Sequence, residues 1–265
     1  MEIIRSRTEV PEMVFDADGS EGQDGIQEAK GKFKLDAHTW LPFAAKTYEL
    51  PMDLSDYVIT LTPMLPSDVP NRNGIAFPLA ELTKFRPPPI ARMAYKAWAG
   101  CPLHLEHDNE DYRTAIGVVL DTSLRRITGF NGNQIWKIMS LVAVSKTKNP
   151  EIAGRVLREE INTYSMGAEG EHFSCSYCGR IMQRYNHCSH LNPEQPIDWD
   201  YVTDHEGKKH LVFRNAHGLS PFEFSVVEDP AWIPATGSVL TDSLVPKSIV
   251  HVDTKDISRV WSNRP

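Results

Sequence analysis

The sequence predicts an α+β fold that is mainly β, and three observations support this class. Runs rich in β-branched and apolar residues recur between turn signals, at 56–65, 115–120, 135–144, 209–215 and 222–227. Helical spacing of apolar residues is confined to short segments, and no internal repeat is present. A chain of 265 residues with 41% hydrophobic residues can also bury a sizeable core. We therefore expect one domain with an insertion rather than a string of domains.

The first predicted elements are an arm, a strand and a short helix. Residues 1–35 include a long acidic, glycine-rich stretch with almost nothing apolar, which predicts a partly flexible N-terminal arm. The strand at 56–65 is followed by Pro66, a turn signal. Apolar residues at helical spacing over 89–98 predict a short helix, which Gly100 would end.

A hairpin, a capped helix and two more strands follow. An Asn-Gly turn signal between 115–120 and 135–144 predicts that these strands form a hairpin. The clearest helix begins after Asn149, a good N-cap, with Pro150 at its first position. Beyond the two later strands the chain is rich in Ser and Thr and lacks periodicity, which predicts a C-terminal tail over 246–265. The main domain is then 36–245.

The charge balance limits the classes of partner. There are 35 acidic and 28 basic residues, a formal net charge of −7, which disfavours nucleic acid and anionic membranes as partners. No apolar stretch is long enough to span a bilayer, and the first residues lack the apolar region of a signal peptide. We therefore expect an intracellular protein whose partners are other proteins.

Three of the four cysteines are clustered and predict a metal site. Cys175 and Cys178 form a Cys-x2-Cys knuckle, and Cys188 and His190 would complete a tetrahedral Cys3His set, which suits zinc. His187 or His172 could replace His190. A redox Cys-x2-Cys pair would leave the third cysteine and the histidine unexplained. Since four protein ligands leave no open position, the zinc would be structural and would hold an insertion at about 171–200.

Two further polar stretches are candidates for chemistry. His104 and His107 lie close to Asp108, a pattern that fits a second metal site, a general base oriented by a carboxylate, or a polar loop. Ser165 precedes Gly167, which could expose a nucleophilic hydroxyl beside backbone amides but is also typical of an ordinary turn. Taken singly, these patterns leave the function open.

The order of these pieces resembles a known family. The pieces are GCPLHLEHD at 100–108, SMGA at 165–168, the cysteine knuckle, and FEFSVVEDPA at 222–231. In this order they resemble the prohead (capsid maturation) proteases of tailed bacteriophages, in the branch with a zinc-knuckle insertion, which is distantly related to herpesvirus assemblin. The resemblance covers about residues 50–235.

The resemblance implies a fold, an activity and a set of site residues. The fold would be an assemblin-like β-barrel core with flanking helices and a zinc-knuckle insertion. The activity would be that of a serine endopeptidase, a hydrolase working by acyl transfer. Ser165 matches the family nucleophile and His107 its general base. Glu223 best matches the third position, with Asp108 and His104 as alternatives.

The resemblance also implies partners and a location. Proteins of this family cleave phage scaffold and major capsid proteins, and commonly themselves, inside the immature prohead in the host cytoplasm during virion assembly. Assemblin relatives dimerise, so a homodimer is a further expectation. Two rivals remain: a non-catalytic, zinc-stapled structural or scaffold protein of the virion, and a metal-dependent hydrolase or nuclease using His104 and His107. The acidic charge disfavours the nuclease.

Overall fold

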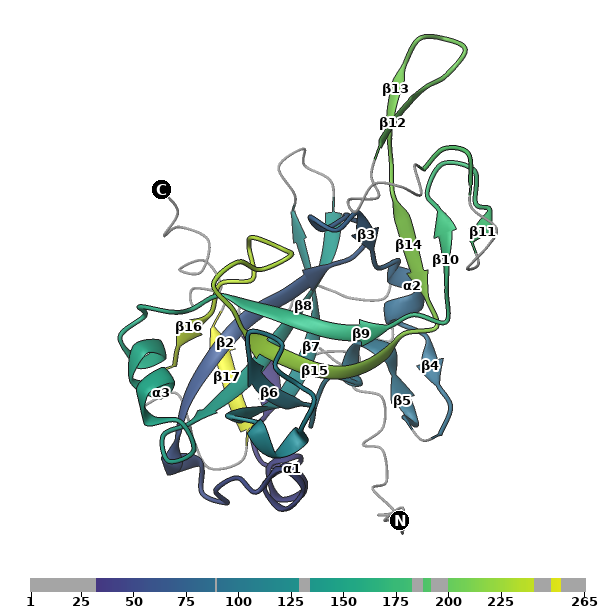
Figure 1. The fold of residues 1–265 in the computed structure, drawn as a ribbon. Coiled ribbons are helices and arrows are strands. Elements are labelled where there is room, and N and C mark those ends of the chain that lie inside the picture. The colour runs from purple at the N-terminus through teal and green to yellow at the C-terminus, as the bar shows by residue number, and fades with distance from the viewer. Residues whose placement is uncertain are drawn as a thin grey trace.

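The protein has a mainly β architecture with few helices. The computed structural model describes residues 32–88, 90–128, 134–182, 188–191, 200–240 and 249–253. Strands account for 43% and helices for 16%, and the main sheet curls into a half-barrel (Figure 1). The predicted mainly-β α+β class is therefore confirmed. Among the described residues, the helices are all too short or too polar to cross a membrane.

A seven-stranded sheet forms the core of the molecule. Its strand order is β16-β2-β8-β7-β6-β15-β9. All neighbouring strands are antiparallel except β6 and β15, which are parallel. The bounds are β2 Tyr57–Pro66, β6 Pro102–Leu105, β7 Gly117–Thr128, β8 Gln134–Ser145, β9 Tyr164–Glu169, β15 Ser220–Val226 and β16 Ser238–Val239.

The two edges of this sheet approach each other at one end. Thr163, just before β9, forms an antiparallel bridge with Thr236, just before β16. The hydroxyl of Tyr164 in β9 also shares a hydrogen bond of 3.1 Å with Oγ1 of Thr60 in β2. These contacts draw the edge strands together, so the sheet encloses one of its faces.

Apolar side chains cover both faces of the sheet. The enclosed face holds the larger cluster, in which the ring of Tyr164 stacks on that of Phe224 with centroids 5.5 Å apart. Helix α3 (Pro150–Leu157) closes this cluster with buried residues such as Val156. A second cluster on the opposite face lies beneath helix α1 (Leu41–Tyr48). Strands such as β8 place alternate side chains in the two clusters. A slip of one residue would move these side chains to the wrong face, so the register of such strands is fixed.

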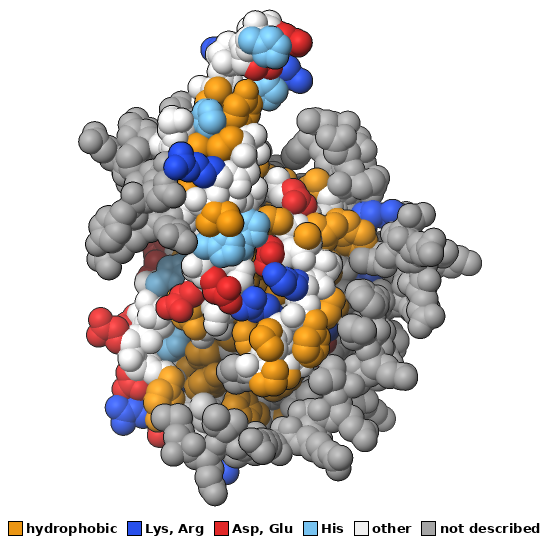
Figure 2. All heavy atoms as spheres, turned by 90° about the vertical axis from the view of Figure 1, so that its right-hand side faces the viewer, with side chains coloured by type: hydrophobic (Ala, Val, Ile, Leu, Met, Phe, Trp, Pro, Cys, Tyr) orange, Lys and Arg blue, Asp and Glu red, His pale blue; other side chains and the backbone are white. Residues whose placement is uncertain are grey.

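The remaining strands and helices lie around the half-barrel. A four-stranded sheet, ordered β11-β10-β14-β3, carries the cysteine cluster. The hairpin β12–β13 projects away from the barrel (Figures 1 and 2). The bounds are β3 Ile75–Ala76, β4 Phe85–Arg86, β5 Arg92–Met93, β10 His172–Cys175, β11 Ile181–Met182, β12 Asp200–Thr203, β13 Lys209–Val212 and β14 Arg214–His217, with α2 Leu79–Leu82 and the 3-10 helices η1 Leu54–Asp56, η2 Ala94–Lys96 and η3 Tyr112–Thr114.

Sequence patterns predicted most strands of the barrel, but the helix predicted at 89–98 is wrong. The predicted cap is present, because the side chain of Asn149 accepts a hydrogen bond of 3.1 Å from the backbone N–H of Ile152. The predicted helix at 89–98 is instead the strand β5 and the 3-10 helix η2. Ala91 has φ +51°, outside the right-handed helical region, and this breaks the α-helical path. The turn predicted between the two central strands lies outside the described residues.

The ends of the described chain pair with each other. Strand β1 (Lys32–Asp36) is antiparallel to β17 (Ile249–Asp253). Strand β1 runs from the end of the expected arm, 1–35, into the expected main domain, whereas β17 lies inside the expected tail, 246–265. The rest of the expected arm and the residues beyond 253 lie outside the described residues.

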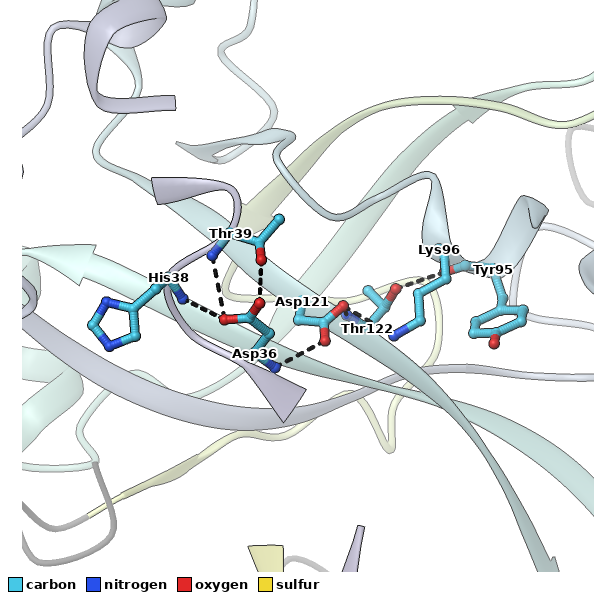
Figure 3. A network of polar contacts seen from close by, with 7 residues as sticks. All are labelled: Asp36, His38, Thr39, Tyr95, Lys96, Asp121 and Thr122. Atoms are coloured by element: carbon cyan, nitrogen blue, oxygen red, sulfur yellow. Dashed lines mark hydrogen bonds and ion pairs between the residues drawn. The ribbon is translucent and has the colours of Figure 1, made fainter. Parts of the chain in front are cut away.

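A polar network joins β1 to the barrel (Figure 3). The carboxylate of Asp121 in β7 accepts a hydrogen bond of 2.9 Å from the backbone N–H of Asp36. Its other oxygen lies 3.0 Å from Nζ of Lys96 in η2. Asp121 thus connects β1, the main sheet and the segment that precedes β6. These contacts help to position β6.

Candidate active site and candidate metal centre

The register of β9 and β15 brings polar side chains together on one face. In β9, Tyr164 and Met166 pack into the enclosed core, so Ser165 and Gly167 point to the opposite face. Ser165 pairs with Ser225, and Gly167 pairs with Glu223. Directly paired residues project on the same side of a sheet, so these four residues share the outer face.

Strand β6 adds the two histidines from the other side of β15. His104 pairs with Ser225 in the parallel register and shares that outer face. After β6 the chain turns sharply, with φ +49° at Glu106 and +60° at His107. This turn returns the ring of His107 over β15, where Nδ1 lies 2.7 Å from Oε1 of Glu223.

The carboxylate of Glu223 is buried but fully partnered. Its side chain is 1% exposed, while that of His107 is 43% exposed. One oxygen accepts from His107, and the other accepts a hydrogen bond of 2.6 Å from the hydroxyl of Ser225. The same hydroxyl accepts a hydrogen bond of 3.3 Å from the backbone N–H of His107. This closed set of bonds fixes the imidazole relative to the carboxylate.

Gly167 makes room for that carboxylate. A Cβ placed on Gly167 would overlap Oε1 of Glu223 and crowd the ring of Phe222. A side chain here would therefore displace Glu223 from its position under His107. The glycine of the Ser-Met-Gly segment is needed for space at this point of the sheet.

The two histidines differ in their ionisation. The hydrogen bond with Glu223 raises the pKa of His107 above its ordinary value, although burial opposes this. Burial lowers the pKa of His104, whose Nδ1 lies 3.3 Å from Oγ1 of Thr114. His107 is therefore the exposed and more basic imidazole, and His104 is the buried and less basic one.

The structure places each candidate residue relative to this pair. Glu223 contacts the imidazole of His107. Asp108 has an exposed side chain and His104 bonds to Thr114, and among the described residues no hydrogen bond joins either of them to the imidazole of His107. Ser165 is half-buried on the neighbouring strand, and no hydrogen bond of the described residues joins it to His107.

Ser225 is part of the site and was not among the expected residues. The sequence signal was present, because Glu223 and Ser225 alternate with the apolar residues Phe224 and Val226. Two polar residues of the same parity in a buried strand must find partners on one face.

The cysteine cluster forms a second site, in the four-stranded sheet. Ligand atoms of Cys175, Cys178, Cys188 and His190 all lie within 4.8 Å of one another. The Sγ atoms of Cys178 and Cys188 are 3.3 Å apart, and Nδ1 of His190 is 3.0 Å from Sγ of Cys188. Gly179, with φ +70°, lets the knuckle turn, and its N–H bonds to the carbonyl of Cys175. The cluster is compatible with a metal site.

The donor set and its surroundings fit a metal ion. The cysteines are free thiols, and Cys175 and Cys188 are buried at 1% and 2% exposure. A hydrogen bond from the backbone N–H of Arg180 is the main cause that lowers the pKa of Cys178, to about 7, whereas burial raises the pKa of Cys188 to about 11. The apolar cluster around them is small: Cys175, Met182, Cys188, Leu191 and Val212. A core this small needs a further cross-link.

The alternative histidine ligands can be placed in part. His172 stacks on His217, with ring centroids 4.9 Å apart, and does not belong to the cysteine cluster. His187 lies outside the described residues. Among the described residues, no metal-ligand cluster includes His104 or His107, so a second metal site receives no support.

Comparisons of the chain with protein-family models, with curated proteins and with solved structures found no match.

Proposed function

We propose that the protein is a serine endopeptidase in which Ser165 is the nucleophile, His107 the general base and Glu223 the residue that orients it. One observation carries this proposal: a buried carboxylate holds Nδ1 of an exposed imidazole at 2.7 Å, on the sheet face that Ser165 shares. A base held by a third group, beside a hydroxyl, is the arrangement that activates a serine.

The contacts assign a role to each ring nitrogen. Glu223 engages Nδ1, so Nε2 is the nitrogen that takes the hydroxyl proton of Ser165 when substrate brings the two within reach. The alkoxide attacks the peptide carbonyl, and the imidazolium then protonates the leaving amine. Water releases the acyl group by the same route in reverse. The buried carboxylate stabilises the imidazolium in both steps.

The resemblance supplies the substrates. We propose phage scaffold and major capsid proteins, and the chain itself, as substrates cleaved inside the immature prohead. The net charge of −7 fits protein substrates better than nucleic acid. A homodimer is the assembly that the resemblance favours.

The metal centre has a separate, structural role in this proposal. Zinc would be held by Cys175, Cys178, Cys188 and His190, a donor set with no position left for substrate. It would supply the cross-link that the small apolar cluster lacks, and no catalytic step passes through it.

The test is co-expression of the protein, or of Ser165→Ala, with a phage scaffold and major capsid protein. We expect cleavage with the wild type, loss of cleavage with Ser165→Ala, and unchanged zinc content. Ser55→Ala, at an exposed serine outside the site, is the matched control and should cleave as the wild type does. Equal cleavage by wild type and Ser165→Ala, or none by either, would contradict the protease.

A second candidate is a non-catalytic structural or scaffold protein of the virion, stapled by zinc. It is favoured by one observation, namely that Ser165 and His107 are not hydrogen-bonded to each other in the described structure. In that case neither protein cleaves, and chelation of the metal impairs assembly instead. The co-expression experiment separates the two candidates.

A further inference from the structure

A pocket lies at the far end of the strand that carries Ser165. It has a volume of about 280 Å³ and opens to solvent beside β4, β9 and β15. Its walls include Arg86, Pro88, Ile90, Glu169, Glu171 and Ser220. In Figure 2, which faces this side of the molecule, acidic and basic side chains lie next to hydrophobic ones below the projecting hairpin.

The register of the sheet places this pocket in line with the proposed active site. Glu169 pairs with Ser220, just as Ser165 pairs with Ser225. Glu169 and Ser165 have the same parity in β9, so both project from the outer face. They are four residues apart, a distance of about 13 Å along a strand. Four residues of a bound peptide in extended conformation span the same distance.

The surface between the two sites is open and partly apolar. Phe222 is the extra residue at the irregularity between Pro221 and Glu223, and its ring is 46% exposed. This ring lies against Gly167, midway between Ser165 and Glu169. Strand β9 also lies at the edge of its sheet. A peptide in extended conformation can therefore follow β9 from one site to the other.

The charged side chains that line the pocket favour a positively charged occupant. Arg86 is paired with Glu171 at 2.6 Å, and its side chain is 12% exposed. Glu169 is exposed and has no ion-pair partner among the described residues. One guanidinium and two carboxylates leave a net negative charge, with the unpaired carboxylate at the rim. Pro88 and Ile90 provide an apolar wall beside it.

We propose that this pocket is a substrate subsite for a Lys or Arg side chain, about four residues from the peptide bond cleaved at Ser165. The aliphatic stem of the side chain packs against Pro88 and Ile90, and its charged end pairs with Glu169. This inference rests on the proposed endopeptidase function and names a part of the substrate that the function leaves open.

The experiment uses the full-length protein and a proteome-derived peptide library, with new termini identified by mass spectrometry. We expect Lys and Arg to be enriched about three- to fivefold at one position three to five residues from the cleaved bond, the range for a partly exposed ion pair. Glu169→Lys should abolish this enrichment or replace it with Asp and Glu. Glu206→Lys makes the same charge change at an exposed residue in the turn of the β12–β13 hairpin and should retain the enrichment.

The outcomes of this experiment distinguish failure of the subsite proposal from failure of the protease proposal. Cleavage that depends on Ser165 but shows no enrichment of Lys or Arg would overturn the subsite and leave the protease in place. No cleavage dependent on Ser165 would overturn both. Equal loss of enrichment in Glu169→Lys and Glu206→Lys would reflect overall charge and would also overturn the subsite. A cooperative thermal unfolding transition, measured for each variant, checks that the variant is folded.

Discussion

At the residue scale, the contact between His107 and Glu223 determines the chemistry of the proposed active site. The carboxylate is buried and accepts hydrogen bonds from both the imidazole and Ser225. It therefore fixes the tautomer of His107 and raises the pKa of the imidazole. Among His104, Asp108 and Glu223, Glu223 is the one hydrogen-bonded to the His107 ring in the described structure, which makes it the best candidate for the third residue of the proposed triad.

Glu223→Gln tests this contact through the pH dependence of cleavage. Activity needs neutral His107, so it falls as the pH drops through the raised pKa of this residue. Removing the carboxylate should lower kcat/KM by about 10²- to 10⁴-fold and move the acidic limb of the profile to lower pH. The measurement is a pH–rate profile of both proteins. An unshifted limb would show that another group titrates.

The same contact predicts a pH-dependent contribution to stability. The pKa of His107 is raised on folding, so its contribution is fully present below the unfolded pKa and is lost as pH rises through the folded pKa. Urea denaturation from pH 5 to 9 should show this loss in the wild type and not in His107→Gln. A wild-type stability that rises with pH over this window, relative to the variant, would contradict it.

Gly167→Ala tests the space beneath the carboxylate. The added Cβ would overlap Oε1 of Glu223, so we expect a loss of about 1–3 kcal/mol in the free energy of unfolding and loss of the His107 contact. Gly154→Ala, in helix α3, is the control, because its Cβ would meet only the flexible end of Arg158 at 3.2 Å. That change should be neutral or stabilising. Denaturation and histidine NMR report both effects.

At the element scale, the cysteine knuckle and the β12–β13 hairpin form one unit with few apolar contacts of its own. Tyr177 of the knuckle packs its ring 5.0 Å from that of His190 and 5.4 Å from that of His210 in β13. His210 in turn lies 2.7 Å from Asp204 in the hairpin loop. The candidate metal ligand His190 is therefore linked to the hairpin through Tyr177.

Cys178→Ala tests the metal as a structural cross-link. We expect the wild type to hold about one zinc per chain, and the variant much less. Hydrogen exchange should rise in β10, β12 and β13, while β7 and β8 stay protected, because the barrel has its own core. Cys101→Ala, at the buried cysteine outside the cluster, should keep its zinc. Zinc near zero in freshly purified wild type would refute the site.

At the scale of the whole molecule, Asp121 joins the chain's first described strand to the barrel. It accepts from the backbone of Asp36 and pairs with Lys96, as Figure 3 shows. Asp121→Asn should cost about 1–2 kcal/mol of unfolding free energy, because a partly buried charge-assisted contact is lost. Glu160→Gln, in the exposed pair with Arg158, should cost less than about 0.5 kcal/mol. Chemical denaturation of both variants measures the difference.

Local patterns predicted much of this fold, and long-range register decided the rest. The mainly β class and the Asn149 cap follow from alternation and capping chemistry, which are local. The segment around Ala91 was predicted wrongly, because the helical spacing of its apolar residues does not reveal the positive φ of Ala91 that interrupts an α-helix. For the third position of the proposed triad the sequence left three candidate residues, because the pairing of β6 with β15 that brings Glu223 to His107 joins distant parts of the chain.

The parallel pairing of β6 with β15 also affects when the site can form during folding. His107 and Glu223 are 116 residues apart in the chain, whereas β7 and β8 are joined by a short connection and pair locally. Contacts between distant residues form late, because a long loop must first close. A nascent chain that has not reached β15 has no carboxylate to orient His107. The proposed active site would therefore be inactive until β15 has been synthesised, and this delays any self-cleavage.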